Sequence, residues 1–250
     1  MGAPAALRGW ALALGACALL AIARAEVAGL RGLHYAFQPP ATLLVLAMAL
    51  RLPTVEAPAY RRWIVAGLAL SLLGDVFLML PFDGFVFGLA SFLLAHLAYL
   101  VALRRRGGWF AIRWPLAAYA AVAALVLLRL WPGLPAELRV PVIVYVVALA
   151  GMAAQAASVW RQCADAPTRL AAVGGAAFVV SDALLALDRF AAPVPHAATW
   201  VLATYWSAQW CIARSVARVA PAAGGQRATG AHCAHAAHAG GAGGHQPGGS

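Results

Sequence analysis

The stretch that decides the fold lies at residues 63–80 and reads WIVAGLALSLLGDVFLML. It is apolar except for one small polar residue, Ser71, and one charged residue, Asp75. At 1.5 Å of rise per residue, a helix of this length spans about 27 Å, close to the thickness of the hydrocarbon core of a bilayer. The stretch therefore predicts a transmembrane helix that carries a carboxyl group.

The composition of the whole chain agrees with a membrane location. The 250 residues are 64% hydrophobic and only 10% charged, and the mean hydropathy is +0.80. Soluble chains carry about 25% charged residues, so this chain could not cover a water-facing surface. The net charge of +10 comes entirely from arginine, and we expect it to serve membrane topology rather than nucleic-acid binding.

Outward from residues 63–80, further apolar stretches predict an all-α integral membrane protein with eight transmembrane helices. We expect an eight-span domain over residues 1–218 and a disordered Gly/Ala/His-rich cytoplasmic tail over 219–250, because the tail lacks large apolar side chains. The first span has an alternative interpretation as a cleaved signal peptide ending at Ala23-Arg24-Ala25. Pro39 and Pro40 should interrupt the start of the second span. The eight expected spans are 9–23, 35–50, 63–80, 85–103, 114–130, 140–160, 170–187 and 197–213.

The arginines fall unevenly on the two sides of this arrangement. Thirteen lie on the side of the termini and five on the other side. Arginine is enriched in cytoplasmic loops, so both termini are predicted to be cytoplasmic, in the inner membrane if the protein is bacterial.

Two acidic residues lie inside predicted spans, Asp75 and Asp182. An ionisable group there costs at least about 2.5–3.5 kcal/mol, so each needs a reason. Both stand 12 residues into outward-running spans, counted from Trp63 and Leu170, or about 18 Å deep. Their surroundings also correspond, which predicts two parallel four-helix repeats that bring both carboxyls to one pocket.

Other polar side chains should converge on the same interior, because lipid cannot satisfy them. His96 and Tyr99 share a face of the fourth span, and Tyr205 and Gln209 share a face of the eighth. Each has an ordinary alternative role in hydrogen bonding between helices, and this holds equally for Ser71 and Ser181.

Together these motifs resemble the lysoplasmalogenase (YhhN-like) family of membrane proteins. Ser71-Leu-Leu-Gly-Asp-Val-Phe-Leu, with Phe92, His96 and Tyr99 downstream, is similar to the family's first signature. Phe178-Val-Val-Ser-Asp, followed by Asp188-Arg-Phe, resembles the second, and Thr204-Tyr-Trp-Ser-Ala-Gln the third, where many members have Tyr-Tyr. The resemblance covers about residues 5–218 and leaves out the His-rich tail.

The resemblance implies a hydrolase that cleaves the vinyl ether bond of lysoplasmalogen, or of a related lysophospholipid or ether lipid. The products would be a fatty aldehyde and glycerophospho-ethanolamine or glycerophospho-choline. Asp75 and Asp182 would be catalytic, because vinyl ether hydrolysis needs a proton donor and an anion, and two carboxyls in one pocket do not both ionise. The residues expected to position substrate and water are Ser71, His96, Tyr99, Ser181, Tyr205 and Gln209. No metal or cofactor is expected, and the partners are the lysophospholipid substrate and membrane lipid.

Three alternatives stay open at this point. A proton-coupled transporter also suits parallel repeats and paired acids in the membrane. A metal-dependent lipid hydrolase could use His34, His96 and His196 with the Asp pair, and the His-rich tail could bind a soft metal. A structural membrane subunit is the third. For the hydrolase, we expect a pocket open toward the non-cytoplasmic half and lined by the third, fourth, seventh and eighth spans.

Overall fold

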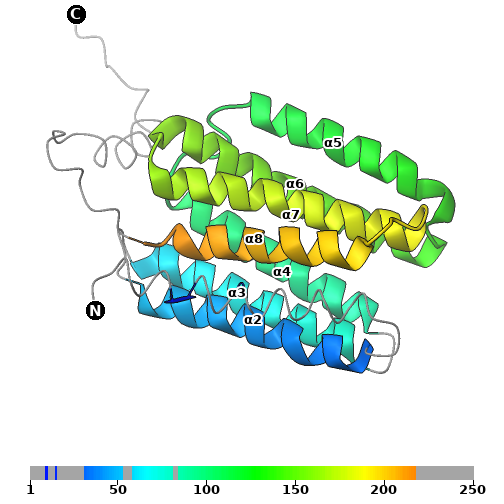
Figure 1. Cartoon of the computed structure of the whole chain (residues 1–250). Helices are drawn as coiled ribbons and strands as arrows, with labels where there is room; N and C mark the ends of the chain where they lie inside the picture. The colour runs from blue at the N-terminus through cyan, green and yellow to red at the C-terminus, as the bar shows by residue number, and fades with distance from the viewer. Residues whose placement is uncertain (1–8, 11–14, 16–30, 53–57, 81–83, 218–250) are drawn as a thin grey trace, which may run out of the picture.

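The computed structural model describes residues 9, 10, 15, 31–52, 58–80 and 84–217, which form a helical bundle (Figure 1). Both the expected first span and the expected tail fall almost wholly outside these residues. The helices in chain order are α2 (Arg31–Arg51), α3 (Pro58–Met79), α4 (Phe85–Arg104), α5 (Trp114–Leu130), the short 3₁₀ helix η1 (Trp131–Gly133), α6 (Ala136–Cys163), α7 (Ala166–Phe190) and α8 (Ala197–Arg214).

Five stretches of the described chain are long and apolar enough to cross a membrane, namely α3, α4, α5 with η1, α6 and α7. The apolar part of α2 is shorter and covers Pro39–Arg51. The predicted fold class, an all-α membrane protein, is therefore confirmed.

The expected break at the start of the second span is wrong. Helix α2 runs from Arg31 to Arg51 straight through Pro39 and Pro40. A proline removes one backbone hydrogen bond and crowds the preceding turn, which bends a helix without always ending it. Pro141 inside α6 is tolerated in the same way.

The helices pack as antiparallel neighbours, most extensively α3 with α4 and α7 with α8. Small residues allow close approach: a Cβ on Gly174 would lie 3.0 Å from the carbonyl oxygen of Ala208 in α8, and one on Gly175 would lie 3.1 Å from Cα of Ala153 in α6. Helix α5 lies at the edge of the bundle (Figure 1) and packs mainly against α6 and, less, α7. Only 6% of its apolar window is buried, against 56% for α6.

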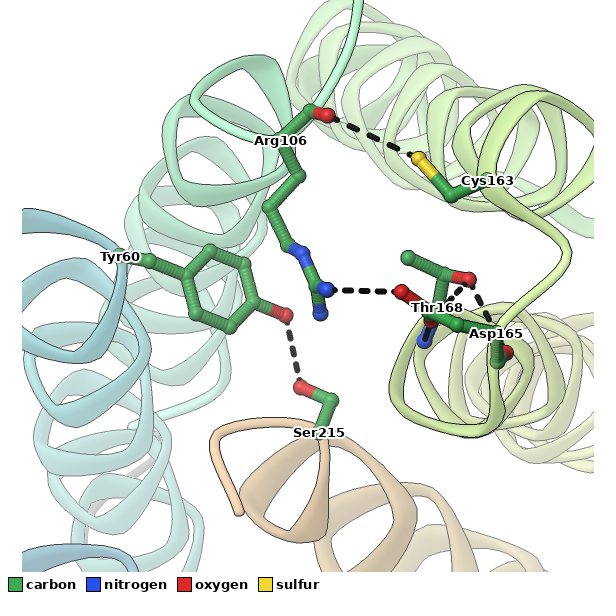
Figure 2. A network of polar contacts seen from close by, with 6 residues as sticks. All are labelled: Tyr60, Arg106, Cys163, Asp165, Thr168 and Ser215. Carbon is green, nitrogen blue, oxygen red and sulfur yellow. Dashed lines mark hydrogen bonds and ion pairs between the residues drawn. The ribbon is translucent and has the colours of Figure 1, made fainter. Parts of the chain in front are cut away.

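One end of the bundle is closed by polar contacts between helix ends (Figure 2). Arg106, just after α4, is buried and pairs with Asp165 at 3.2 Å, and its guanidinium lies 5.2 Å from the ring centre of Tyr60. The Tyr60 hydroxyl is 2.7 Å from Oγ of Ser215, just after α8. Asp165 also caps α7 by accepting from the backbone N–H of Thr168 at 2.7 Å. These contacts join the ends of α3, α4, α7 and α8 at one end of the bundle.

Candidate active site

A pocket of about 350 Å³ runs from the middle of the bundle to the end opposite the Arg106–Asp165 pair. Its deep wall carries both Asp75 and Asp182. Its lining continues to the last turn of α3 at Met79 and to the first turn of α8 at Ala197. Asp188 and Arg189 line the pocket near the end of α7, and the rest of the lining is largely apolar. The pocket therefore combines the two deep acids with a lipid-like wall.

The walls of the pocket differ from the expected set of four spans. Helices α3, α4, α7 and α8 do contribute, but so do α5 and α6. Helix α5 contributes Tyr119, Val122, Ala123, Val126 and Leu130, and α6 contributes Val142, Tyr145, Val146, Leu149 and Ala150. The expectation was incomplete because it followed the polar motifs, and these walls are mostly plain apolar surface.

Asp75 is fully buried and is held by hydroxyl groups from two distant helices. Thr42 in α2 donates to Oδ2 of Asp75 at 2.7 Å, and Tyr205 in α8 donates to the same atom at 2.9 Å. Both donors are themselves buried, so the carboxyl group is fixed in orientation. Sequence reasoning identified Tyr205 but not Thr42.

Asp182 in α7 is half-buried and accepts a hydrogen bond from the Tyr145 hydroxyl in α6 on its Oδ2. Sequence reasoning did not identify Tyr145. A signal was available, since Tyr145 is the one hydroxyl in the apolar run from Val140 to Leu149. A polar atom in such a run needs a partner inside the bundle.

A chain of hydrogen bonds lies behind Asp75, away from the pocket. Tyr99 donates to Oε1 of Gln209 at 3.0 Å, and Nε2 of Gln209 donates to the Tyr205 hydroxyl at 2.9 Å. Ser71 lies 3.4 Å from the Tyr99 hydroxyl. Because Tyr205 in turn donates to Asp75, the chain orients the carboxyl group through Tyr205.

His96 is completely buried, and neither ring nitrogen has a hydrogen-bond partner among the described residues. Three aromatic rings surround it: its ring centre lies 5.1 Å from Phe178, 5.4 Å from Tyr145 and 6.4 Å from Tyr99. Two of these rings belong to the tyrosines that serve the two carboxyls. His96 therefore stands between the two halves of the polar centre, behind the pocket wall.

Ser181 occupies a different position from the other expected residues. It lines the pocket, but its hydroxyl donates to the backbone carbonyl of Val201 at 3.1 Å and so ties α7 to α8. Among the expected residues, Asp75, Asp182, Ser181 and Tyr205 face the pocket, whereas Ser71, His96, Tyr99 and Gln209 lie behind it. Within the described part of the chain, no three His, Cys, Asp or Glu side chains lie close enough together to hold a metal ion.

Comparison with known protein families gives a match over most of the chain. The YhhN family matches residues 33–216, which include every helix that contributes to the pocket. The chain belongs to the YhhN family.

Several known proteins are similar over most of this chain. A Mycobacterium bovis protein named lysoplasmalogenase is 37% identical over 182 residues, which are 66% of this chain and 63% of that protein. The pig protein lysoplasmalogenase TMEM86B is 35% identical, over 70% of this chain and 73% of its own length. The Escherichia coli protein named uncharacterized membrane protein YhhN is 31% identical over 60% of this chain and 70% of its own. The chain thus spans about 63% of the length of the mycobacterial relatives. No solved structure matches it.

Proposed function

We propose that this YhhN-family protein is a lysoplasmalogenase, which hydrolyses the vinyl ether bond of lysoplasmalogen or a related ether lysophospholipid. The products are a fatty aldehyde and glycerophospho-ethanolamine or glycerophospho-choline. The observation that carries the proposal is the pair of carboxyls, Asp75 and Asp182, on the wall of one largely apolar pocket. The names of the mycobacterial and pig relatives support the same activity, and they do not favour a transporter.

The reaction needs a proton and an anion at the same place. An acid protonates the β-carbon of the vinyl ether, which forms a C–H bond and leaves an oxocarbenium ion. Water adds to this cation and loses a proton, and the hemiacetal then breaks its C–O bond to release aldehyde and alcohol. A carboxylate beside the cation lowers the energy of the transition state.

The hydrogen bonds favour one division of roles. Two hydroxyl groups donate to Oδ2 of Asp75, an arrangement that suits an ionised carboxylate. Tyr145 donates to Oδ2 of Asp182, so the proton of a neutral Asp182 sits on its other oxygen. We therefore assign Asp182 as the acid and Asp75 as the anion that stabilises the oxocarbenium ion.

The remaining polar residues position these two groups in the proposal. Tyr205, Gln209, Tyr99 and Ser71 orient Asp75 through their hydrogen-bond chain. Ser181 fixes α7 against α8 beside Asp182. His96 packs against the aromatic rings of Tyr99 and Tyr145 and keeps them in place.

We also propose eight spans with both termini in the cytoplasm, in the inner membrane if the protein is bacterial. The arginine-rich helix ends then face the cytoplasm, and the pocket faces the other side. The two closely packed pairs, α3 with α4 and α7 with α8, support the two parallel repeats, since each pair contributes one of the two acids.

The direct test replaces each acid in the purified protein. Asp75→Asn and Asp182→Asn should each lower aldehyde release from a 1-alkenyl-glycerophospho-ethanolamine about 100-fold or more, the range of a lost general acid. Glu137→Gln is the matched control, since Glu137 is exposed at the start of α6 and does not line the pocket. Wild-type rates in either Asp variant, folded in membranes, would contradict the paired-acid mechanism.

A further inference from the structure

The pocket does not end at the two acids but continues past them on one side. Tyr145, which donates to Asp182, marks the level of this acid on α6. Leu149 and Ala150 also line the pocket, and they follow Tyr145 on α6 by about 6–8 Å of helix. This part of α6 leads to its last residue, which contacts the backbone at the closed end of the bundle. The extension therefore lies deeper than the acids.

Two further helices reach the same depth. On α7, Val179 lines the pocket and precedes Asp182 by about 5 Å of helix, in the direction of the closed end. The backbone N–H of Ile112, just before α5, donates to Oγ of Ser158 in α6 at 3.0 Å, which sets the register of these two antiparallel helices. Tyr119, two helical turns after Ile112, therefore lines the pocket from α5 at the depth of the extension.

The deep part of the pocket differs in character from its other end. Asp188 and Arg189 line the pocket near the end of α7 and make that end polar. None of the deep side chains carries a charge, so a phosphate placed among them would lose its hydration without gaining an ionic partner, whereas an alkyl chain is stabilised by burial there. We call these four side chains the deep subsite: Leu149, Ala150, Val179 and Tyr119.

We propose that the deep subsite binds the hydrocarbon chain of the lysophospholipid beyond its vinyl ether, and that Ala150 limits the length of chain that fits. This inference rests on the proposed function. The vinyl ether joins the chain to glycerol, so a chain in the deep subsite leaves the ether at the level of Asp75 and Asp182. The head group then lies toward the polar end of the pocket. The direction of the substrate follows from where the pocket is apolar.

Ala150 is singled out by its size and its place on α6. Val142, Val146 and Ala150 are spaced by four residues, so they form a row on one face of the helix, and all three line the pocket. Ala150 is the deepest and smallest member of this row. A bulky side chain there would shorten the pocket from its deep end and leave the contact between Tyr145 and Asp182 in place.

The test compares two 1-alkenyl-glycerophospho-ethanolamines that differ only in their chain, one hexadecenyl and one butenyl. In Ala150→Phe, kcat/KM for the hexadecenyl substrate should fall about 10-fold or more, because its chain no longer fits without strain. The butenyl chain ends before the deep subsite, so its kcat/KM should stay within about twofold of wild type. The matched control is Val147→Phe, which should change neither value: Val147 is on the same helix, is 65% exposed and does not line the pocket.

The outcomes separate this inference from the proposed function. Thermal unfolding in detergent checks that each variant is folded, and Ala150→Val, a smaller enlargement, gives the same comparison if phenylalanine prevents folding. A folded Ala150 variant that loses both substrates equally, or neither, would overturn the deep subsite while wild-type cleavage of the vinyl ether stands. A wild-type protein that releases aldehyde from neither substrate would overturn the proposed function, and the deep subsite with it.

Discussion

Asp75 receives its two hydroxyl donors from opposite ends of the described chain, Thr42 in α2 and Tyr205 in α8. A buried acid without partners would be expensive, whereas hydrogen bonds to a charged group contribute about 1.5–3 kcal/mol each. The carboxyl is therefore tolerated only because three helices converge on it. The proposed function and the packing of these helices would then depend on the same residue.

Tyr145 gives the sharpest prediction at the residue scale. Tyr145→Phe removes only the hydroxyl that donates to Asp182. Aldehyde release should fall about 10-fold or more in kcat with little change in KM, because the lost contact holds the acid rather than the substrate. Tyr119→Phe serves as the control, since Tyr119 lines the same pocket from α5. Equal kinetics for the two variants would contradict a role for Tyr145 in holding the acid.

The residues show where sequence reasoning reaches its limit. Asp75 and Asp182 could be found because a charge inside an apolar span is conspicuous. Thr42 could not be found in this way, because hydroxyl side chains are common in membrane helices. Its role depends on how α2 packs against α3. The position of His96 behind the pocket wall, rather than on it, depends likewise on the tilt and rotation of α4, which helical spacing does not determine.

At the scale of the helices, the predicted spans coincide with α2 to α8, but several helices extend beyond them. Helix α6 begins at Ala136 and α7 at Ala166, four residues before their expected spans. Hydropathy reports where lipid ends, whereas hydrogen bonding and capping decide where a helix ends. Asp165 marks the true start of α7 because its side chain caps the backbone there.

Contacts between α3 and α4 give a prediction at this scale. A Cβ on Gly67 would lie 2.2 Å from Cε1 of Tyr99, so Gly67→Ala must displace the ring whose hydroxyl begins the chain to Asp75. We expect a loss of about 1–3 kcal/mol in stability together with reduced aldehyde release. Thermal unfolding in detergent measures the first effect. Gly151→Ala is the matched control, because nothing lies within 4 Å of a Cβ at Gly151. An unchanged melting temperature in Gly67→Ala would show that Tyr99 is not held in this position.

Across the whole molecule, the two ends of the bundle differ in character. One end is closed by the Arg106–Asp165 pair and its neighbours (Figure 2), and the pocket extends to the other. Arg106 is buried and Asp165 is partly exposed, and their ion pair joins the ends of α4 and α7. The closed end is therefore suited to hold the helices together while the other end admits a ligand.

The proposed orientation can be tested by labelling. A cysteine placed at the exposed Ala192, between α7 and α8, should react with an impermeant maleimide on intact cells. A cysteine at the exposed Arg105, near the closed end, should react only after the membrane is made permeable. Labelling is measured against the background of the unaltered protein. The reverse pattern would show that the orientation in the membrane is opposite to the one proposed.

The position of α5 at the edge of the bundle has a consequence for how the proposed reaction would be measured. This helix forms one wall of the pocket while most of its surface faces outward. A lipid already dissolved in the bilayer contacts the outward surface of α5 and so reaches the protein without passage through water. Occupancy of the pocket would then follow the mole fraction of substrate in the membrane rather than its amount per volume of solution. Diluting the substrate with inert lipid should slow turnover, whereas adding buffer at a fixed lipid composition should leave it unchanged.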